Sequence, residues 1–335
     1  MREISITAKD AGQRLDKYLR KCLPEAGTGF LYKMLRKKNI TLNGKKAEGN
    51  ELLKDTDVIR VFFSEETFEK MCGRTVKTGG GENAGSGNAV SVTAENRRQK
   101  AEEAYRKLKG IEIVYEDEHL LFVNKPAGIL SQGDDSGLLS LNDWILGYCL
   151  QTSDGDAGAL QPAVCNRLDR NTSGLVLCGK TYAGSRFLSD QIKSHAFRKF
   201  YRAEVEGRLS GEKILSGYWS KDEKANLVRI TEKPLHPKDL KVQTAYRILA
   251  YNAKEDITLA EVELITGKSH QIRAHMASIG HPLAGDLKYG GHVRKSIRTQ
   301  RLHAYAVRFP KMEGAFAGLS EREFTCLVSW LKEWG

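Results

Sequence analysis

The sequence predicts an α+β domain preceded by a small basic module, and three observations support this. From residue 110 to residue 335, apolar runs of strand length alternate with runs of helical spacing, which is typical of an α/β or α+β domain. Residues 67–109 interrupt this pattern with a glycine-rich, apolar-poor stretch, which predicts a flexible linker. Residues 1–66 carry helix and strand patterns of their own. A chain of 335 residues is long enough for two such domains.

Composition restricts the class of partner and the compartment. The net charge of +11 favours a polyanionic partner, of which nucleic acid is the commonest. The six cysteines lack the spacing of zinc or redox motifs, so we expect reduced thiols. No apolar stretch approaches the roughly 18 residues of a membrane helix, and the N-terminus has no hydrophobic signal run. We therefore expect a soluble cytoplasmic monomer with no membrane partner.

The N-terminal module has two helical patterns followed by a hairpin signal. Residues 13–20 and residues 30–36 place apolar side chains at helical spacing. Alternating residues then run into Asn43-Gly44, a strong signal for a tight turn, and residues 58–61 form a closing strand. Two helices, a basic corner and this turn resemble an S4 RNA-binding domain.

Basic residues are concentrated in the same module. Up to residue 38 the chain has ten lysines or arginines against four acidic residues. Such a cluster is suited to the phosphates of RNA, although a solvated helix face is the alternative for any single side chain. The candidate phosphate contacts are Arg14, Lys17, Arg20, Lys21, Lys33, Arg36, Lys37 and Lys38.

The elements of the large domain follow from periodicity and from turn residues. A charged, alanine-containing helix could lead into it over residues 95–109. Lysine, proline and glycine at 125–128 end the second strand. We expect strands at 111–115, 120–124, 174–178, 200–205 and 257–264, and helices at 185–194 and 271–278.

Residues 166–177, N-R-L-D-R-N-T-S-G-L-V-L, are the most informative segment. They place Asp169 between Arg167 and Arg170, just before an apolar run. A carboxylate in this basic setting is held ionised, and an ionised aspartate can act as a nucleophile. The alternative is a structural aspartate paired with one of the two arginines. A second polar segment, G-K-S-H-Q-I-R-A-H, spans residues 267–275.

Together with N-K-P-A-G at 124–128 and K-F-Y at 199–201, these segments resemble the motifs of the RNA pseudouridine synthases that carry an R-L-D motif and modify large-subunit ribosomal RNA. The resemblance covers about residues 110–310. It implies the pseudouridine synthase fold, a mixed and largely antiparallel sheet with flanking helices. It also implies isomerisation of uridine to pseudouridine without a cofactor. The substrate expected is 23S ribosomal RNA or its precursors.

The resemblance assigns roles to particular residues. Asp169 becomes the nucleophile, and Arg273 pairs with its carboxylate. Tyr201 stacks on uracil and can take part in proton transfer, whereas a tyrosine in a strand is otherwise more often a core residue. Arg167 fills the space left by an extruded uridine or contacts a phosphate. Further RNA contacts expected at this site are Lys125, Lys268, His270 and Gln271.

Two positions depart from the family pattern. Asn166 replaces the usual histidine, and Lys268-Ser269 replaces Arg-Thr. His270 and His275 are five residues apart, a spacing that does not place both side chains on one helical face, so we expect no metal site.

The alternatives to a ribosomal RNA enzyme are a transfer RNA pseudouridine synthase and a non-catalytic RNA-binding factor in ribosome assembly.

Overall fold

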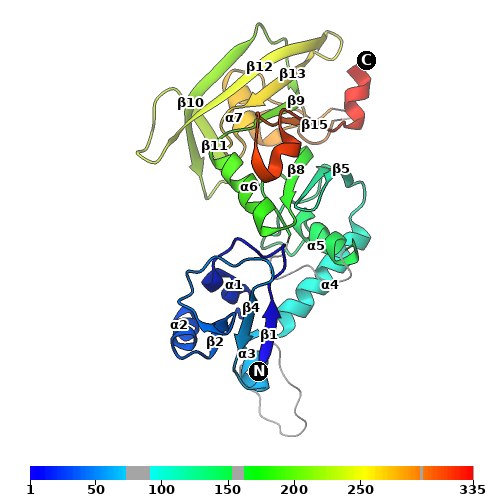
Figure 1. Cartoon of the computed structure of the whole chain (residues 1–335). Coiled ribbons are helices and arrows are strands. Elements are labelled where there is room, and N and C mark those ends of the chain that lie inside the picture. Colours follow the sequence, from blue (N-terminus) through cyan, green and yellow to red (C-terminus); the bar gives the residue numbers. More distant parts are fainter. Residues whose placement is uncertain (73–90, 153–161, 295–296, 335) are drawn as a thin grey trace.

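The computed structural model describes residues 1–72, 91–152, 162–294 and 297–334. In this part of the chain the strands form two sheets (Figure 1). A four-stranded sheet belongs to the N-terminal module, and an eleven-stranded sheet forms the frame of the rest of the protein. The two sheets and their flanking helices confirm the predicted α+β class.

The N-terminal module packs two helices against a small antiparallel sheet with strand order β1-β4-β2-β3. Both predicted helices are present, and the predicted turn has Asn43 and Gly44 at φ of 50° and 74°, as a tight hairpin turn requires. The elements are β1 (Arg2–Ser5), α1 (Leu15–Cys22), α2 (Thr28–Arg36), β2 (Ile40–Leu42), β3 (Lys45–Lys46) and β4 (Val58–Val61).

Both ends of the expected linker are helical. The first helix, α3 (Glu65–Cys72), buries Phe68 in the core of the N-terminal module, so this module continues beyond residue 66. The second helix, α4 (Ser91–Lys107), buries Ala101 and Ala104. The linker prediction for 67–109 therefore needs correction at both ends. Its glycine-rich centre, residues 78–88, lies outside the described residues.

Helix α4 packs tightly on α5 (Leu141–Thr152). The backbone at Gly147 approaches α4 so closely that a Cβ there would lie 2.2 Å from the carbonyl oxygen of Ala101. Only glycine permits this contact. Helix α4 is thus part of the large domain, since its buried side faces α5.

The large sheet has the strand order β11-β10-β12-β13-β9-β14-β8-β6-β5, with β15 beside β14 and β7 beside β8. Among the described strands, β8 and β14 pair in parallel and all other pairs are antiparallel. The strands are β5 (Glu112–Glu116), β6 (Leu120–Lys125), β7 (Ala163–Val164), β8 (Ser173–Gly179), β9 (Arg198–Glu206), β10 (Lys213–Asp222), β11 (Leu227–Thr231), β12 (Leu240–Asn252), β13 (Ile257–Leu264), β14 (Leu302–Arg308) and β15 (Glu323–Thr325).

Helices cover both faces of the central strands. In β6, Leu121 and Val123 face one core and Leu120 and Phe122 face the other, as the two-residue period of a strand requires. Helices α5 and α7 cover the first core, and α6 and η2 cover the second. Burial of one such large side chain stabilises the fold by about 2 kcal/mol. The remaining helical elements are α6 (Tyr182–Lys193), α7 (Gln271–Ser278), η1 (Leu287–Tyr289), η2 (Gly314–Leu319) and η3 (Ser329–Trp334).

The N-terminal module contacts the large domain at the start of α6. The backbone N–H of Tyr182 donates to the carbonyl of Lys9 at 3.2 Å. The ammonium of Lys21 lies 5.3 Å from the centre of the Tyr182 ring, within the range of a cation–π contact. Lys21, expected to bind phosphate, therefore lies at the junction of the two modules.

All six cysteines are free thiols. None of the helices within the described residues combines the length and the apolar character that a membrane crossing needs.

Candidate active site

The loop before β8 holds Asp169 in a fixed turn. The backbone N–H of Thr172 donates to the carbonyl of Asp169 at 3.0 Å, and Ser131 bonds both backbone groups of Leu168. Asn166 donates to one carbonyl of β8 at 3.3 Å and accepts from the backbone N–H of Leu177 at 2.7 Å. The asparagine that replaces the family histidine therefore attaches the Asp169 loop to the adjacent strand.

Arg273 joins Asp169 to a second carboxylate. Its Nη1 donates to Oδ2 of Asp169 at 2.8 Å. Its Nε and Nη2 donate to the two oxygens of Asp286 at 2.6 and 2.7 Å, a bidentate geometry that fixes the plane of the guanidinium. Arg273 is 6% exposed and Asp286 is 2% exposed. Burial opposes the charge of Arg273, but Asp286 and Asp169 outweigh burial and raise its pKa.

The residue before α7 completes the surroundings of Asp169. His270 has a φ of 55°, and this left-handed turn brings its Nε2 within 3.7 Å of Oδ2 of Asp169. Its Nδ1 lies 2.9 Å from the hydroxyl of Tyr289, whose ring also lies 4.9 Å from the Arg273 guanidinium. Burial lowers the pKa of His270 despite the nearby carboxylate, so the imidazole is neutral at pH 7.

Tyr201 lies on β9, between β13 and β14, and is 7% exposed. Burial and the charge of Asp169 raise the pKa of its phenol. The hydroxyl therefore keeps its proton at neutral pH and can act as a hydrogen-bond donor. The ring offers a flat face to a planar base.

A cavity of about 590 Å³ opens over Asp169, Tyr201 and Arg273. This volume is in the range of small-molecule sites and can hold a nucleotide. The exposed side chains of Arg167 and Lys268 lie at its rim. Tertiary structure thus brings together seven of the residues expected at this site, namely Arg167, Asp169, Tyr201, Lys268, His270, Gln271 and Arg273.

Lys125 does not match its expected role. Its side chain is fully buried, and its Nζ donates to the carbonyls of Pro126 at 3.0 Å, Ile129 at 2.8 Å and Arg170 at 3.2 Å. Burial lowers the pKa of Lys125 to about 7, and the charge of Asp169 opposes this shift. The structure does not support the expected RNA contact, because the ammonium is buried and instead fastens the loop after β6 to the Asp169 loop.

Gln271 also differs from the expectation. It lines the cavity but is 1% exposed, and its Nε2 donates to the carbonyl of Gln243 and to the hydroxyl of Thr244, both at 2.9 Å. Its Oε1 accepts from the backbone N–H of Lys268 at 3.2 Å. Its amide is therefore engaged by protein groups that shape the loop before α7, rather than free to contact RNA.

Several residues of the site had no assigned role in the sequence analysis. Asp286 and Tyr289 lie after α7, at the start and the end of η1, and Lys199 and Lys221 lie on β9 and β10. Local pattern does not reveal them, because Asp286 meets its arginine across 13 residues and the strands reach the cavity only in the folded sheet. For Lys199 one signal was present, its place in the K-F-Y segment at 199–201 that carries part of the family resemblance.

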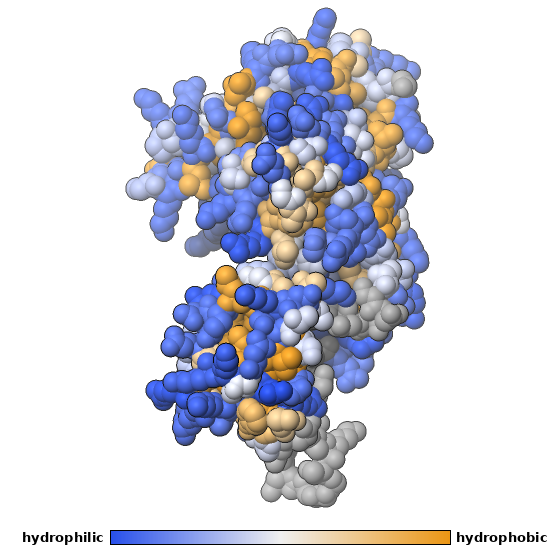
Figure 2. All heavy atoms as spheres, in the orientation of Figure 1, coloured by the Kyte–Doolittle hydropathy of each residue, from blue (hydrophilic) through white to orange (hydrophobic). Residues whose placement is uncertain are grey.

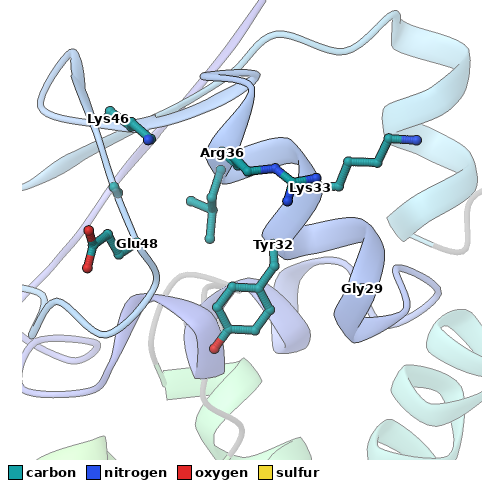
Figure 3. Close-up of a pocket in the computed structure, with 8 residues that line it drawn as sticks. Gly29, Tyr32, Lys33, Arg36, Lys46 and Glu48 are labelled. Atoms are coloured by element: carbon teal, nitrogen blue, oxygen red, sulfur yellow. The ribbon is translucent and has the colours of Figure 1, made fainter.

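The N-terminal basic residues lie on an exposed helix surface. Figure 3 shows Tyr32, Lys33 and Arg36 of α2 on one side of a pocket, with Lys46 and Glu48 on the other. This pocket has a volume of about 340 Å³. Hydrophilic side chains cover this part of the module in Figure 2. The expected contacts Lys17, Lys33, Arg36, Lys37 and Lys38 are all exposed.

Arg14 and Arg20 are partly neutralised by an acidic neighbour. Nε of Arg14 lies 3.1 Å from a carboxylate oxygen of Asp16, and Nη2 of Arg20 lies 3.9 Å from the other oxygen. Both arginines remain almost half exposed. Within the described residues, no cluster of three or more His, Cys, Asp or Glu side chains could hold a metal ion.

Comparisons with known proteins show which family this chain resembles. A family described as RNA pseudouridylate synthase matches residues 119–278. The ribosomal large subunit pseudouridine synthase C of Vibrio cholerae is 31% identical over 307 residues, covering 91% of this chain and 83% of that protein. An RNA pseudouridine synthase of Mycoplasma genitalium is 29% identical over 314 residues, covering 92% and 89%. The structure of human RNA pseudouridylate synthase domain containing 4 shares the fold, with a TM-score of 0.54 and 18% identity over 71% of this chain and 94% of that one.

Proposed function

Because the chain belongs to the RNA pseudouridylate synthase family and is therefore an isomerase that acts on RNA, we propose that its substrate is large-subunit ribosomal RNA and its nucleophile is Asp169. The assignment of the nucleophile rests on the unequal hydrogen bonding of the two oxygens of the Asp169 carboxylate. Oδ2 accepts a hydrogen bond from Arg273, whereas Oδ1 has no hydrogen-bond partner among the described residues. Arg273 thus orients the carboxylate while one oxygen is available to a ligand.

The arrangement supports a cofactor-free isomerisation. The reaction breaks the bond between C1′ of the ribose and N1 of uracil, and forms a bond between C1′ and C5. Overall, the proton on C5 is lost and N1 gains one. Arg273 holds the Asp169 carboxylate in a fixed orientation, and Tyr201 stacks on the base with its hydroxyl protonated. Arg167 at the rim occupies the space left by the extruded uridine or contacts a phosphate.

Two observations support a large ribosomal RNA substrate. The exposed basic residues of α1 and α2 add a phosphate-binding surface to the N-terminal module, which resembles an S4 domain. A relative that aligns with most of the chain is named for the large ribosomal subunit. We propose that the N-terminal module supplies salt-dependent affinity and that the large domain selects the uridine.

Pseudouridine mapping of total RNA, from cells with and without the gene, tests this function. We expect one or a few positions of 23S ribosomal RNA to lose pseudouridine when the gene is absent. Wild-type protein should restore them and Asp169→Asn should not, while both bind the RNA with similar affinity. Asp134→Asn, which changes another carboxylate lining the cavity, is the matched control and should restore the modification.

Each outcome decides between the alternatives. Loss of pseudouridine in transfer RNA would keep the reaction and replace the substrate. Restoration by Asp169→Asn would remove the nucleophile assignment. No change in any RNA, with the protein expressed, would favour a non-catalytic RNA-binding factor.

A further inference from the structure

Lys199 is a half-buried cation that faces the active-site cavity and has no anionic partner among the residues that the structure describes. It lies on β9 and lines the same cavity as Asp169 and Tyr201. Among the described residues, its ammonium makes no hydrogen bond or ion pair. Burial lowers the pKa of Lys199, and no carboxylate compensates for the lost hydration of the charge.

The other cations of the cavity are engaged by protein groups or exposed at its rim. Arg273 bonds two carboxylates, and Lys221 pairs with Glu223 at 2.5 Å. Nε of Arg170 donates to a backbone carbonyl at 3.2 Å. Lys199 differs from these three, because its charge is partly desolvated and no anion in the described part of the chain offsets the cost.

Strand geometry directs Lys199 toward the substrate. Residues two apart on a strand point to the same face and lie about 7 Å apart along it, so Lys199 and Tyr201 share the cavity side of β9. The absence of a side chain at Gly267 leaves room for the ammonium, because Nζ of Lys199 would lie only 3.2 Å from a Cβ placed there. A side chain at 267 would crowd this position.

We propose that Lys199 is a positioning residue that binds a phosphate oxygen of the RNA strand next to the uridine held between Asp169 and Tyr201. This inference rests on the proposed function and extends it to the backbone of the substrate. A nucleotide carries a phosphate on either side of its ribose, so a strand that stacks its base on Tyr201 brings an anion close to β9. Phosphate is also the ligand that offsets a partly buried ammonium.

The first test measures equilibrium binding to a transcript of large-subunit ribosomal RNA at several salt concentrations. Lys199→Met keeps the aliphatic stem and removes the charge. We expect about tenfold weaker binding and a salt slope smaller by about one, as loss of one phosphate contact requires. Lys311→Met, which changes an exposed lysine outside the cavity, should leave both unchanged. A wild-type slope for Lys199→Met would overturn the proposal.

Thermal unfolding without RNA separates a phosphate contact from a structural role. Removal of an uncompensated charge should leave the Tm of Lys199→Met equal to or above that of the wild type. A clearly lower Tm would show that Lys199 is structural and would also overturn the proposal. Lys199→Arg, which keeps the charge, should recover most of the salt slope.

A neutral linkage identifies the ligand. Short RNAs that carry the target uridine are made with a single methylphosphonate on its 5′ or its 3′ side. One of these linkages should weaken binding and slow single turnover for the wild type, but have little effect on Lys199→Met. If the neutral linkages weaken binding equally for the wild type and for Lys199→Met, Lys199 does not contact either phosphate and the proposal is overturned. If the wild type binds the transcript yet forms no pseudouridine, the proposed function fails, while the salt slope still decides the role of Lys199.

Discussion

At the scale of single residues, the site depends on a carboxylate that never contacts Asp169. Asp286 is buried and holds two of the three donor positions that Arg273 uses. The third reaches Asp169. Asp286 thus helps to orient the proposed nucleophile through Arg273. The guanidinium is planar, so its contact with Asp286 also fixes the direction in which it faces Asp169.

Asp286→Asn should lower activity more than it lowers RNA affinity. The asparagine keeps the volume and one acceptor but loses the bidentate contact, so Arg273 can rotate away from Asp169. We expect a fall in the single-turnover rate of about 10- to 100-fold, the usual effect of a small misplacement of a reacting group. The free energy of unfolding should fall by about 1–3 kcal/mol.

Single-turnover assays at saturating RNA, together with urea unfolding, check this prediction. Asp190→Asn is the matched control, because Asp190 is an exposed carboxylate on α6. A rate for Asp286→Asn within twofold of the wild type would mean that Arg273 keeps its position without Asp286.

At the scale of elements, the parallel pair of β8 and β14 holds the Asp169 loop next to β9. Gly174, in β8, has a φ of 118°, and a Cβ there would lie 2.3 Å from the carbonyl oxygen of Ala304. His303, on β14, bonds the hydroxyl of Ser173 at 2.8 Å. The close backbone approach at Gly174 therefore allows β8, which follows the Asp169 loop, to pair with β14, which lies beside Tyr201 on β9.

Gly174→Ala should separate β8 from β14 and destabilise the protein by more than about 3 kcal/mol, because the added carbon meets backbone atoms that cannot move aside. Gly211→Ala is the control, since Gly211 also has a positive φ but, apart from its two chain neighbours, none of the described residues has an atom within 4 Å of its Cβ position. It should cost only about 1 kcal/mol. Urea unfolding followed by circular dichroism measures both, and equal losses would show that only backbone strain matters at Gly174.

At the scale of the whole molecule, two buried histidines make stability depend on pH. Burial lowers the pKa of His275 and of His303 to about 4, against 6.5 for a solvated imidazole. Below pH 6.5 the unfolded chain binds protons that the folded chain does not, so the free energy of unfolding falls as pH falls from about 6.5 to about 4. Each histidine should cost about 2 kcal/mol between pH 7 and pH 5.

Urea titrations at pH 7 and pH 5 test this expectation. His275→Gln keeps a hydrogen-bonding side chain near Thr244 but cannot titrate. The part of the pH dependence of the unfolding free energy that the two histidines cause should therefore fall by about half. His195→Gln changes an exposed histidine and should keep the wild-type dependence. A His275→Gln protein as sensitive to acid as the wild type would contradict the assignment.

The basic surface of the N-terminal module should account for much of the salt dependence of RNA binding. A variant with Lys33, Arg36, Lys37 and Lys38 changed to glutamine should reduce the salt slope by about 3 and weaken binding. A second variant, with exposed Lys213, Lys254, Lys311 and Lys332 changed to glutamine, has the same net charge and is the control. Equal slopes in the two variants would mean that overall charge, rather than this surface, attracts the RNA.

The elements that sequence analysis anticipated are those with strong periodicity. Helices α1, α2 and α7 and strands β6, β8 and β13 agree within a few residues, because one side or both sides of each is buried. Strand β10 was missed since, along its length, Gly217 is its one buried residue, which leaves no apolar alternation. Helix α5 was missed because half of its residues are buried, four of them in a row at 144–147, which weakens the contrast that reveals a helix.

The sequence by itself determined the fold class, the basic N-terminal surface and the chemical types at the site, because periodicity and charge are properties of neighbouring residues. Only the tertiary structure decided which groups meet. Arg273 reaches Asp169 across 104 residues and Asp286 across 13, and Lys125, which was expected to contact RNA, is buried and bonds the Asp169 loop. Such contacts depend on the order of strands in the sheet and on the exclusion of water between them, and neither is encoded in any local pattern.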